Sequence, residues 1–490
     1  MNSAMILIAM MLPVLAGACL PFFHFEKRSS RQIYVITPVV ITSLIILAIL
    51  CGPLGEMVTL LKLTESFAIA FRVDGLAAVF LGLIAFLWPL ATIFAFEYIK
   101  HEGMDDRFFC FYTMTYGITI GVATSANLVT MYLFYELLTL ATVPLIMHAM
   151  SRRAIKASKK YLAYSVGGAS MAFIGIIILY ACGNGSLEFV YGGFPGVSSM
   201  EKHIIVLAYL MMFFGFGVKA AVFPLHGWLP SAGVAPTPVT ALLHAVAVVK
   251  AGVFAIMRTT IYCFGMDVLR GTPAQYIAMA FAAFTILFGS SMALKEQHIK
   301  RRLAYSTVSN LSYILLGVTL MTPAGFTGAM AHMIFHGVMK ISLFLCAGAI
   351  MYKTHLEYVP QYYGFGKKMP VTFLTFSIGS LALIGIPLLP GFISKWSIAT
   401  AAMEAGGITA YLGIGALLLS AALTAGYLLP IIVRAYAPGA NFDWDTVAKV
   451  EDPNGYMKVP FVILCVAMVI LGLCSNGLIH LLEQVAAGLL

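Results

Sequence analysis

The chain has 490 residues, of which 61% are hydrophobic and only 10% charged, and its formal net charge is +9. An ordinary soluble domain carries about 25% charged residues, so this composition excludes a soluble protein. Apolar runs of about twenty residues recur throughout, and a helix of that length crosses a hydrocarbon layer about 30 Å thick. Runs such as 204–216 lack the alternation of a transmembrane β-strand. The composition predicts an all-α polytopic membrane protein.

About fourteen transmembrane helices are predicted. In chain order they are expected near 3–23, 33–51, 74–96, 107–125, 127–149, 160–182, 204–223, 237–257, 274–294, 303–321, 326–351, 370–399, 409–433 and 459–476. The first run has neither the basic flank nor the cleavage site of a signal peptide, so we expect it to be a spanning helix.

Prolines and glycines interrupt the seventh and twelfth predicted helices, at 224–238 and 385–391. Proline removes a backbone hydrogen bond, and inside a membrane the exposed groups need protein or water partners. Broken helices at corresponding places in two halves are typical of inverted repeats around an ion site. Four regions are therefore expected: helices 1–3 in 1–100, a first five-helix repeat (helices 4–8) in 101–260, a second, inverted repeat (helices 9–13) in 261–436, and a cytoplasmic loop with the last helix in 437–490.

The basic residues predict the orientation of the chain. Of the 29 lysines and arginines, 20 fall in loops on one side of the predicted topology and five, Arg258 among them, on the other. Basic residues in short loops stay on the cytoplasmic side, so we expect a multi-pass protein of the cell (cytoplasmic or inner) membrane with both termini on the outer side. The positive charge matches anionic lipid headgroups, and no nucleic-acid partner is expected.

The four remaining basic residues lie inside predicted helices: Lys219, Lys250, Lys340 and Lys395. A lysine at mid-membrane is costly, so it usually faces a polar interior and marks an ion pathway. The alternative is a fixed counter-ion, or a lysine that reaches to the membrane surface.

Other titratable groups lie inside the predicted helices as well. Glu136 lies in the fifth and needs a cation or a proton there, or a structural hydrogen bond. His332, His336 and Lys340 are spaced by four residues, so they share one helix face as a ladder. Imidazole can accept and donate a proton, although these histidines could also serve only to join helices. His244 and Lys250 would point about 120° apart on a continuous helix and would need a bridging water to line one path.

Nothing in the sequence indicates a cofactor. The eight cysteines are scattered without a CxxC pair, and no glycine-rich nucleotide loop or Walker motif occurs. We expect no metal, flavin or nucleotide in this chain, and any redox chemistry would belong to a partner.

Several segments carry a family resemblance: Phe134 to Glu136, then FPLHGWLPSAGVAPTPVTALLHAVAVVKAG, IKRRLAYSTVSN, HMIFHGVMKISLFLCAGA and GIPLLPGFISKW. The chain resembles the antiporter-like subunits shared by respiratory complex I, membrane-bound energy-converting hydrogenases and Mrp-type cation/proton antiporters. The resemblance implies a relay in which Glu136 pairs with Lys219 and weakening of this pair releases a proton from the lysine. The implied relay continues through His244, Lys250, His332, His336 and Lys340 to Lys395 at the exit position, and we expect a hydrated path along it.

Two residues depart from the family pattern. Ser231 stands where an aspartate usually follows Trp-Leu-Pro, and His298 stands where an acidic residue often precedes Ile-Lys-Arg. Both departures concern the cytoplasmic entry route.

The implied function is that of a proton-translocating subunit of a multi-subunit, redox-driven pump, which would have other membrane subunits as partners, including further antiporter-like ones. The alternative is the D-type subunit of an Mrp Na⁺/H⁺ antiporter, so the ion could be H⁺ or Na⁺. Only one predicted helix follows the second repeat, which argues against the distal complex I subunit. A stand-alone solute transporter would need a substrate pocket, and a membrane enzyme would need a catalytic motif.

Overall fold

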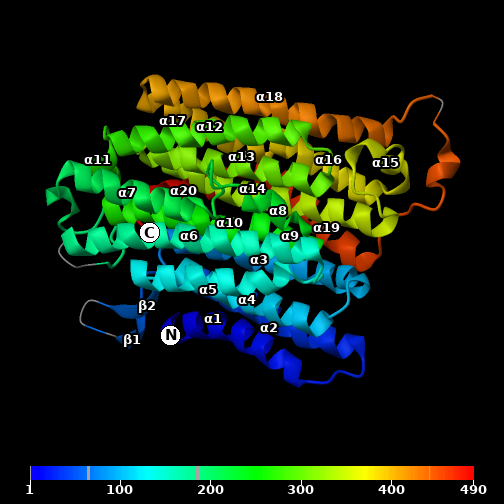
Figure 1. The fold of residues 1–490 in the computed structure, drawn as a ribbon, viewed down its shortest axis with the longest axis horizontal. Helices are drawn as coiled ribbons and strands as arrows, with labels where there is room; N and C mark the ends of the chain where they lie inside the picture. The colour runs from blue at the N-terminus through cyan, green and yellow to red at the C-terminus, as the bar shows by residue number, and fades with distance from the viewer. Residues whose placement is uncertain (1, 63, 65–66, 183–186, 441) are drawn as a thin grey trace.

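The structure, a computed structural model, describes residues 2–62, 64, 67–182, 187–440 and 442–490. The long helices run side by side along one direction and form a single bundle (Figure 1). The helices are α1 (Asn2–Cys19), α2 (Arg28–Leu50), α3 (Gly75–Tyr98), α4 (Asp105–Thr124), α5 (Leu128–Ile146), α6 (Arg152–Cys182), α7 (Lys202–Gly217), α8 (Trp228–Ser231), α9 (Thr237–Ala245), α10 (Val248–Arg258), α11 (Met266–Leu269), α12 (Pro273–Lys295), α13 (Ile299–Thr319), α14 (Pro323–Thr354), α15 (Phe365–Lys368), α16 (Pro370–Ile384), α17 (Pro390–Ala405), α18 (Ile408–Tyr436), α19 (Gly455–Leu473) and α20 (Asn476–Ala486).

The helices confirm a multi-pass membrane protein. In the described part of the chain, ten helical segments are long and apolar enough to cross a membrane, and α7 and α16 are shorter apolar helices. Each predicted segment coincides with one helix or with a broken pair of helices. The chain therefore has ten to twelve candidate spans by length and composition.

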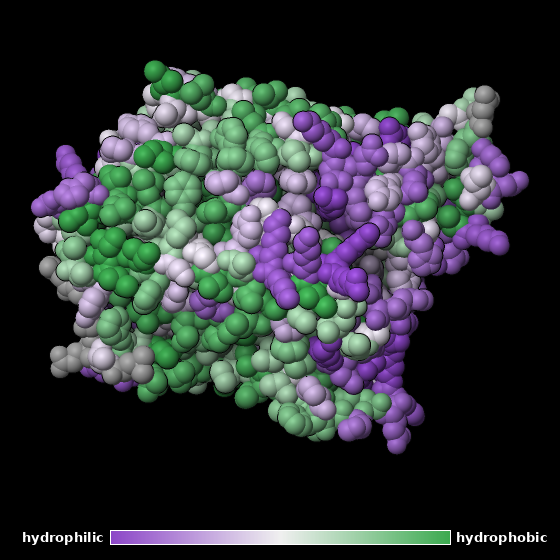
Figure 2. All heavy atoms as spheres, in the orientation of Figure 1, coloured by the Kyte–Doolittle hydropathy of each residue, from purple (hydrophilic) through white to green (hydrophobic). Residues whose placement is uncertain are grey.

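Polar and apolar surfaces separate along the bundle. Figure 2 shows a mostly hydrophobic surface over the half nearer α7 and α11, whereas hydrophilic side chains gather toward the end that carries α15. Both chain ends lie at the opposite end from α15 (Figure 1). This separation fits a membrane protein whose basic loops share one side.

Helix α14 is the centre of the bundle. It begins at Pro323 behind Thr322, whose hydroxyl accepts a hydrogen bond from the Gly325 N–H at 3.1 Å, and it is buried along nearly its whole length. Helices from both halves of the chain, including α3, α9, α13, α16, α17 and α19, pack against it. Polar residues on α14 are therefore enclosed by protein rather than lipid.

The fold departs from the all-α prediction at one place. Strands β1 (Met57–Lys62) and β2 (Ala68–Arg72) pair antiparallel as a small hairpin at the end of the bundle where the chain begins (Figure 1). The hairpin edge is tied to the bundle because the Ala70 N–H donates to the Thr130 hydroxyl at 3.1 Å. Helix α20, which was not predicted either, packs against α14.

One helix break lies where the prolines predicted it, because residues 385–389 separate α16 from α17. The other predicted break begins earlier than expected, because α7 already ends at Gly217, before Lys219 and Pro224, and a third break was not predicted. The eighth predicted helix is also broken, because the N–H groups of Val246 and Ala247 both donate to the Leu242 carbonyl, at 3.0 and 2.9 Å. This third break separates α9 from α10 and has no proline or glycine to signal it.

Candidate functional site

Lys219 follows the end of α7 and is completely buried. Its Nζ lies 3.4 Å from the centre of the Tyr135 ring and donates to the Tyr135 carbonyl on α5. Gly252 on α10 makes this placement possible, because a Cβ there would lie 2.8 Å from the Lys219 carbonyl carbon. Lys219 is thus wedged between α5 and α10, with its charge against a carbonyl dipole and an aromatic face.

Glu136 is the neighbour of Tyr135 on α5 and is half-buried. Its Oε1 is buried without a protein hydrogen-bond partner in the described structure. No ion pair within 4.0 Å joins Glu136 to Lys219 among the described residues, and Lys219 instead engages the main chain one residue away. The two charged groups belong to one region but do not form a contact pair here.

Lys250 on α10 and His336 on α14 form the direct link between the two halves of the chain. Lys250 Nζ lies 2.8 Å from His336 Nδ1, and both side chains are fully buried. The break between α9 and α10 turns Lys250 toward α14. A proton can therefore be shared between an amine and an imidazole that are 86 residues apart.

His332 continues the line along α14. Its ring lies 5.8 Å from that of His336, with the two ring planes 30° apart, so the two histidines share one face as the four-residue spacing predicts. Its Nδ1 lies 2.9 Å from the Ser394 hydroxyl on α17, and the Tyr313 ring packs edge-on at 5.2 Å. The imidazoles of α14 are thus connected to the second broken helix.

Lys340 is buried on α14, and Lys395 is half-buried on α17. Lys340 Nζ donates to the Leu303 carbonyl at 3.1 Å and to the Ser306 hydroxyl. Lys395 Nζ donates to the carbonyls of Leu383 and Ile384, at 2.7 and 2.9 Å, where α16 ends. The helix break therefore supplies the acceptors that hold the Lys395 ammonium.

His244 lies at the end of α9 and is fully buried. Its ring packs 4.6 Å from Phe344 of α14, and neither ring nitrogen has a protein partner in the part of the chain described. Gly337 on α14 contributes to this close packing, because a Cβ there would lie 2.9 Å from the Leu83 side chain of α3 and 3.3 Å from the Ala245 carbonyl oxygen at the end of α9. His244 and Lys250 thus reach α14 from two half-helices, and the 120° separation expected on a continuous helix does not apply.

The contacts of the eight predicted residues form separate groups. Hydrogen bonds or ring contacts join the members of three groups: Lys219 with Tyr135, Lys250 through the two histidines of α14 to Ser394, and Lys340 with Ser306. The ring of Tyr313 bridges His332 to Lys395, whose Nζ lies 5.2 Å from it.

Some buried polar residues were missed or misplaced at the sequence level. Arg258, counted there as a loop residue, is buried on α10, and its two Nη atoms contact the Asp74 carboxylate at 2.5 and 2.6 Å. Burial raises the pKa of Asp74, but the charge and hydrogen bonds of Arg258, together with the Ala77 N–H and the charge of Arg72, outweigh that effect and hold the pKa below its usual value. Lys300 was also assigned to a loop and is buried, where it donates to the Ala235 carbonyl at 2.8 Å. Because both lie at helix ends, hydropathy alone could not show their burial.

A cluster of hydroxyl groups was not predicted either. The Ser420 hydroxyl on α18 contacts those of Ser290, Ser309 and Tyr313 at 2.5, 3.1 and 2.6 Å. This cluster of hydroxyl groups includes that of Tyr313 and joins α12, α13 and α18. Serines are common in transmembrane helices, so their spacing carried no signal.

Comparison with known proteins confirms the resemblance. The family model described as "NADH:quinone oxidoreductase/Mrp antiporter, TM" matches residues 125–424. NADH-quinone oxidoreductase subunit N of Desulforudis audaxviator is 31% identical over 433 residues, which is 86% of this chain and 85% of that protein. Subunit L of the Mycobacterium tuberculosis enzyme is 33% identical over 82% of this chain, which spans 62% of that longer relative.

The fold is also similar to a solved structure. A chain of the membrane-bound sulfane sulfur reductase, an archaeal respiratory membrane complex, superposes with a TM-score of 0.86 at 21% identity, covering 98% of this chain and 97% of that one. The family match includes Lys219 and the helices α9, α10, α14 and α17, which carry the other lysines and histidines of the site, as well as α5, which carries Glu136. The chain therefore belongs to the NADH:quinone oxidoreductase/Mrp antiporter transmembrane family.

Proposed function

We propose that this chain is a proton-translocating, antiporter-like subunit of a multi-subunit, redox-driven ion pump of the complex I-like or energy-converting hydrogenase-like type. Its relay comprises Glu136, Lys219, His244, Lys250, His332, His336, Lys340 and Lys395. The observation that carries this proposal is the buried contact of Lys250 Nζ with His336 Nδ1 at 2.8 Å. That contact joins α10 in the first half of the chain to α14 in the second half through groups that bind protons.

The chemistry of the buried lysines and histidines favours protons over metal cations as the translocated ion. Its members are amines and imidazoles held by carbonyls, hydroxyls and each other, and such groups take up and release protons. Hard cations such as Ca²⁺ prefer several oxygen ligands. The Nε2 atoms of His332 and His336 are buried without protein partners in the described part of the chain, and buried polar atoms of this kind are normally paired with water. Water between these rings would let each imidazole pass a proton on.

The proposal extends to topology. All fourteen helical segments cross the membrane, and the ranges 101–260 and 261–436 are the two inverted repeats between the helices of 1–100 and the region 437–490. Both termini face the outer side of the cell membrane. Its partners are other membrane subunits, including further antiporter-like ones; the similar proteins that are named as parts of multi-subunit complexes support the presence of partner subunits.

The second candidate function is that of a D-type subunit of an Mrp-type Na⁺/H⁺ antiporter, because the family model includes both kinds of protein. The two candidates share the relay and differ in partners. Proteins that co-purify in mild detergent separate them: redox subunits support the pump, and a set of small antiporter subunits supports the exchanger.

The proposal is tested by Lys250→Met in the assembled complex. Methionine keeps the length of the side chain but cannot bind a proton, so we expect proton transfer into sealed vesicles to fall at least about tenfold. The control is Met333→Leu, a buried, non-titratable change on α14, which should leave the rate nearly unchanged. If the Lys250→Met complex assembles and pumps at the normal rate, the line through Lys250 is not the proton path.

A further inference from the structure

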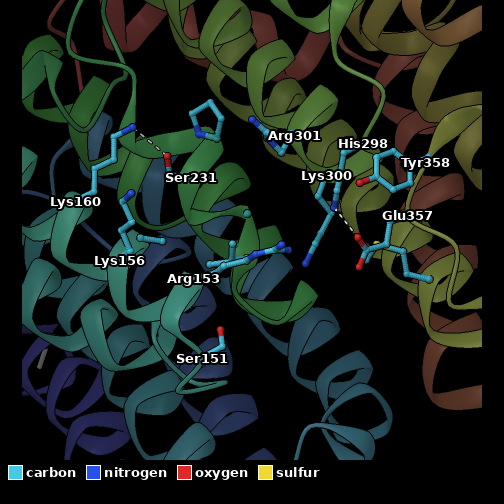
Figure 3. A pocket seen from close by; sticks show the side chains of 15 residues that line it. Ser151, Arg153, Lys156, Lys160, Ser231, His298, Lys300, Arg301, Glu357 and Tyr358 are labelled. Carbon is cyan, nitrogen blue, oxygen red and sulfur yellow. Dashed lines mark hydrogen bonds and ion pairs between the residues drawn. The ribbon is translucent and has the colours of Figure 1, made fainter.

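A basic cavity of about 730 Å³ lies at the end of the bundle where α6 begins. Figure 3 shows side chains from the start of α6 on one side of it and those near the start of α13 on the other. Five cations line it, and Glu357 is the lining carboxylate; the cations are Arg153, Lys156, Lys160, Lys300 and Arg301. Hydrophilic side chains protrude together over this end of α6 in Figure 2.

The positive charge of the cavity is not cancelled within it. The Glu357 carboxylate lies 3.3 Å from His298 Nε2, and Arg301 pairs at 3.3 Å with Glu296, which does not line the cavity. Lys160 donates to the Ser231 hydroxyl at 3.1 Å, and Lys300 donates to the Ala235 carbonyl. Both acceptors are neutral. Among the described residues, Arg153, Lys156, Lys160 and Lys300 have no carboxylate within ion-pair distance.

Both departures from the family pattern lie in this cavity. Ser231 and His298 line it, at positions where the resemblance leads one to expect acidic residues. Two carboxylates there would face Lys160 and Glu357 and would cancel much of the positive charge. Their replacement by a hydroxyl and an imidazole leaves a concave surface that attracts an anion.

Two of the lysines that line the cavity begin an exposed stripe along α6. Along α6, exposed residues follow one another at alternating steps of four and three, which keeps them on one helix face. The stripe begins with two lining lysines and becomes small and then apolar: Lys156, Lys160, Ala163, Gly167, Ser170, Ile174 and Ile177. A Cβ at Gly167 would meet nothing within 4 Å, so this face of α6 is uncovered in the described structure.

We propose that this cavity binds the phosphate of an anionic phospholipid, whose acyl chains lie along the exposed stripe of α6. The four uncompensated cations recognise the charge, and the apolar stripe below them favours a lipid over a free anion. The site is distinct from the buried relay, whose residues do not line it.

The test is a lipid titration of the full-length protein, purified with its partners and delipidated in detergent, with bound lipids counted by native mass spectrometry. The probes are phosphatidylglycerol, zwitterionic phosphatidylcholine and inorganic phosphate. We expect saturable binding of phosphatidylglycerol that neither phosphatidylcholine nor millimolar phosphate reproduces. Phosphate that binds with the same affinity would overturn the lipid assignment, and so would equal binding of phosphatidylcholine.

Variants on α6 separate the cavity from general surface charge. Lys156→Gln with Lys160→Gln should weaken phosphatidylglycerol binding about 30-fold, since each basic group near the lipid surface contributes about fivefold. The matched control is Arg152→Gln with Lys159→Gln, which removes the same charge from exposed positions of the same helix outside the lining. The control double variant should bind phosphatidylglycerol with nearly the same affinity as the parent protein. Equal losses in both double variants would show that surface charge alone attracts the lipid.

A third variant introduces the acidic residue that the family pattern leads one to expect at position 231. Ser231→Asp would place a carboxylate beside Lys160 and should reduce phosphatidylglycerol binding while leaving all basic residues in place. Unchanged binding in this variant would contradict the role of the cavity.

Discussion

At the residue scale, the buried lysines are stabilised by dipoles rather than by counter-charges. Lys219, Lys340 and Lys395 donate to carbonyl or hydroxyl oxygens, and Lys250 contacts an imidazole. A lysine paired with a carboxylate would leave a buried unpaired charge when it lost its proton. Neutral acceptors avoid that penalty, as the proposed relay requires.

Arg258 is the contrasting case, because its guanidinium is held by both oxygens of Asp74 and its charge is permanent. Asp74→Asn should destabilise the protein by about 3–5 kcal/mol, the cost of leaving one partner of a buried ion pair unpaired. Thermal unfolding in detergent measures this loss. The control is Glu188→Gln, since Glu188 is 48% exposed and its ion pair with Arg72 is a surface pair. A Tm for Asp74→Asn equal to that of the control would mean that the buried pair contributes little.

The same pair predicts a dependence on pH. The pKa of Asp74 is lowered in the folded protein, so its stabilising effect is present above the ordinary carboxyl value of 3.8 and is lost as the pH falls through the lowered pKa. The difference in Tm between the parent protein and Asp74→Asn should therefore decrease only when the pH falls below the ordinary carboxyl value of 3.8. A gap that closes near neutral pH would contradict the lowered pKa.

At the element scale, two of the helix breaks hold or turn a lysine of the proposed relay. The α16–α17 break presents the carbonyls that hold Lys395, and the α9–α10 break turns Lys250 toward α14. Free carbonyls are tolerated inside a membrane only where a protein group satisfies them. The breaks are thus part of the site rather than defects of the helices.

Gly391 allows α17 to begin against α16, because a Cβ there would lie 1.8 Å from the Ala382 carbonyl oxygen. Gly391→Ala should push α17 away, loosen the hold on Lys395, and lower both Tm and proton transfer. The matched control is Gly415→Ala on α18, where a Cβ meets nothing within 4 Å; alanine there should be neutral or stabilise by up to about 1 kcal/mol. Equal behaviour of the two variants would show that the close approach at Gly391 does not matter.

At the scale of the whole molecule, both chain ends lie opposite the end that carries α15 (Figure 1). Leu490 is anchored there, since its carbonyl accepts a hydrogen bond from the Gly75 N–H at 3.2 Å. The basic loops predict that α15 faces the cytoplasm. The orientation of the bundle therefore decides to which side the proposed relay would open and in which leaflet the basic cavity lies.

Two epitope tags test this orientation. A tag appended after Leu490 should bind antibody on intact cells stripped of any outer envelope, whereas a tag inserted at Gly439, in the loop that follows α18, should bind only after the membrane is permeabilised. The opposite pattern would reverse the topology and place the basic cavity in the outer leaflet.

The sequence by itself determined what depends on local properties. Hydropathy runs located the helices, prolines marked two of the breaks, and helical periodicity placed His332 and His336 on one face. These features follow from interactions between residues a few positions apart, so they can be predicted without knowing the packing.

Only the tertiary structure decided which groups meet. Lys250 and His336 are 86 residues apart, the break after Ala245 has no proline or glycine, and Arg258 is buried because α10 packs beside Asp74. The basic cavity likewise joins the start of α6 to residues near the start of α13. Such contacts depend on how distant helices pack, and hydropathy and spacing do not encode that packing because many arrangements bury the same apolar surface.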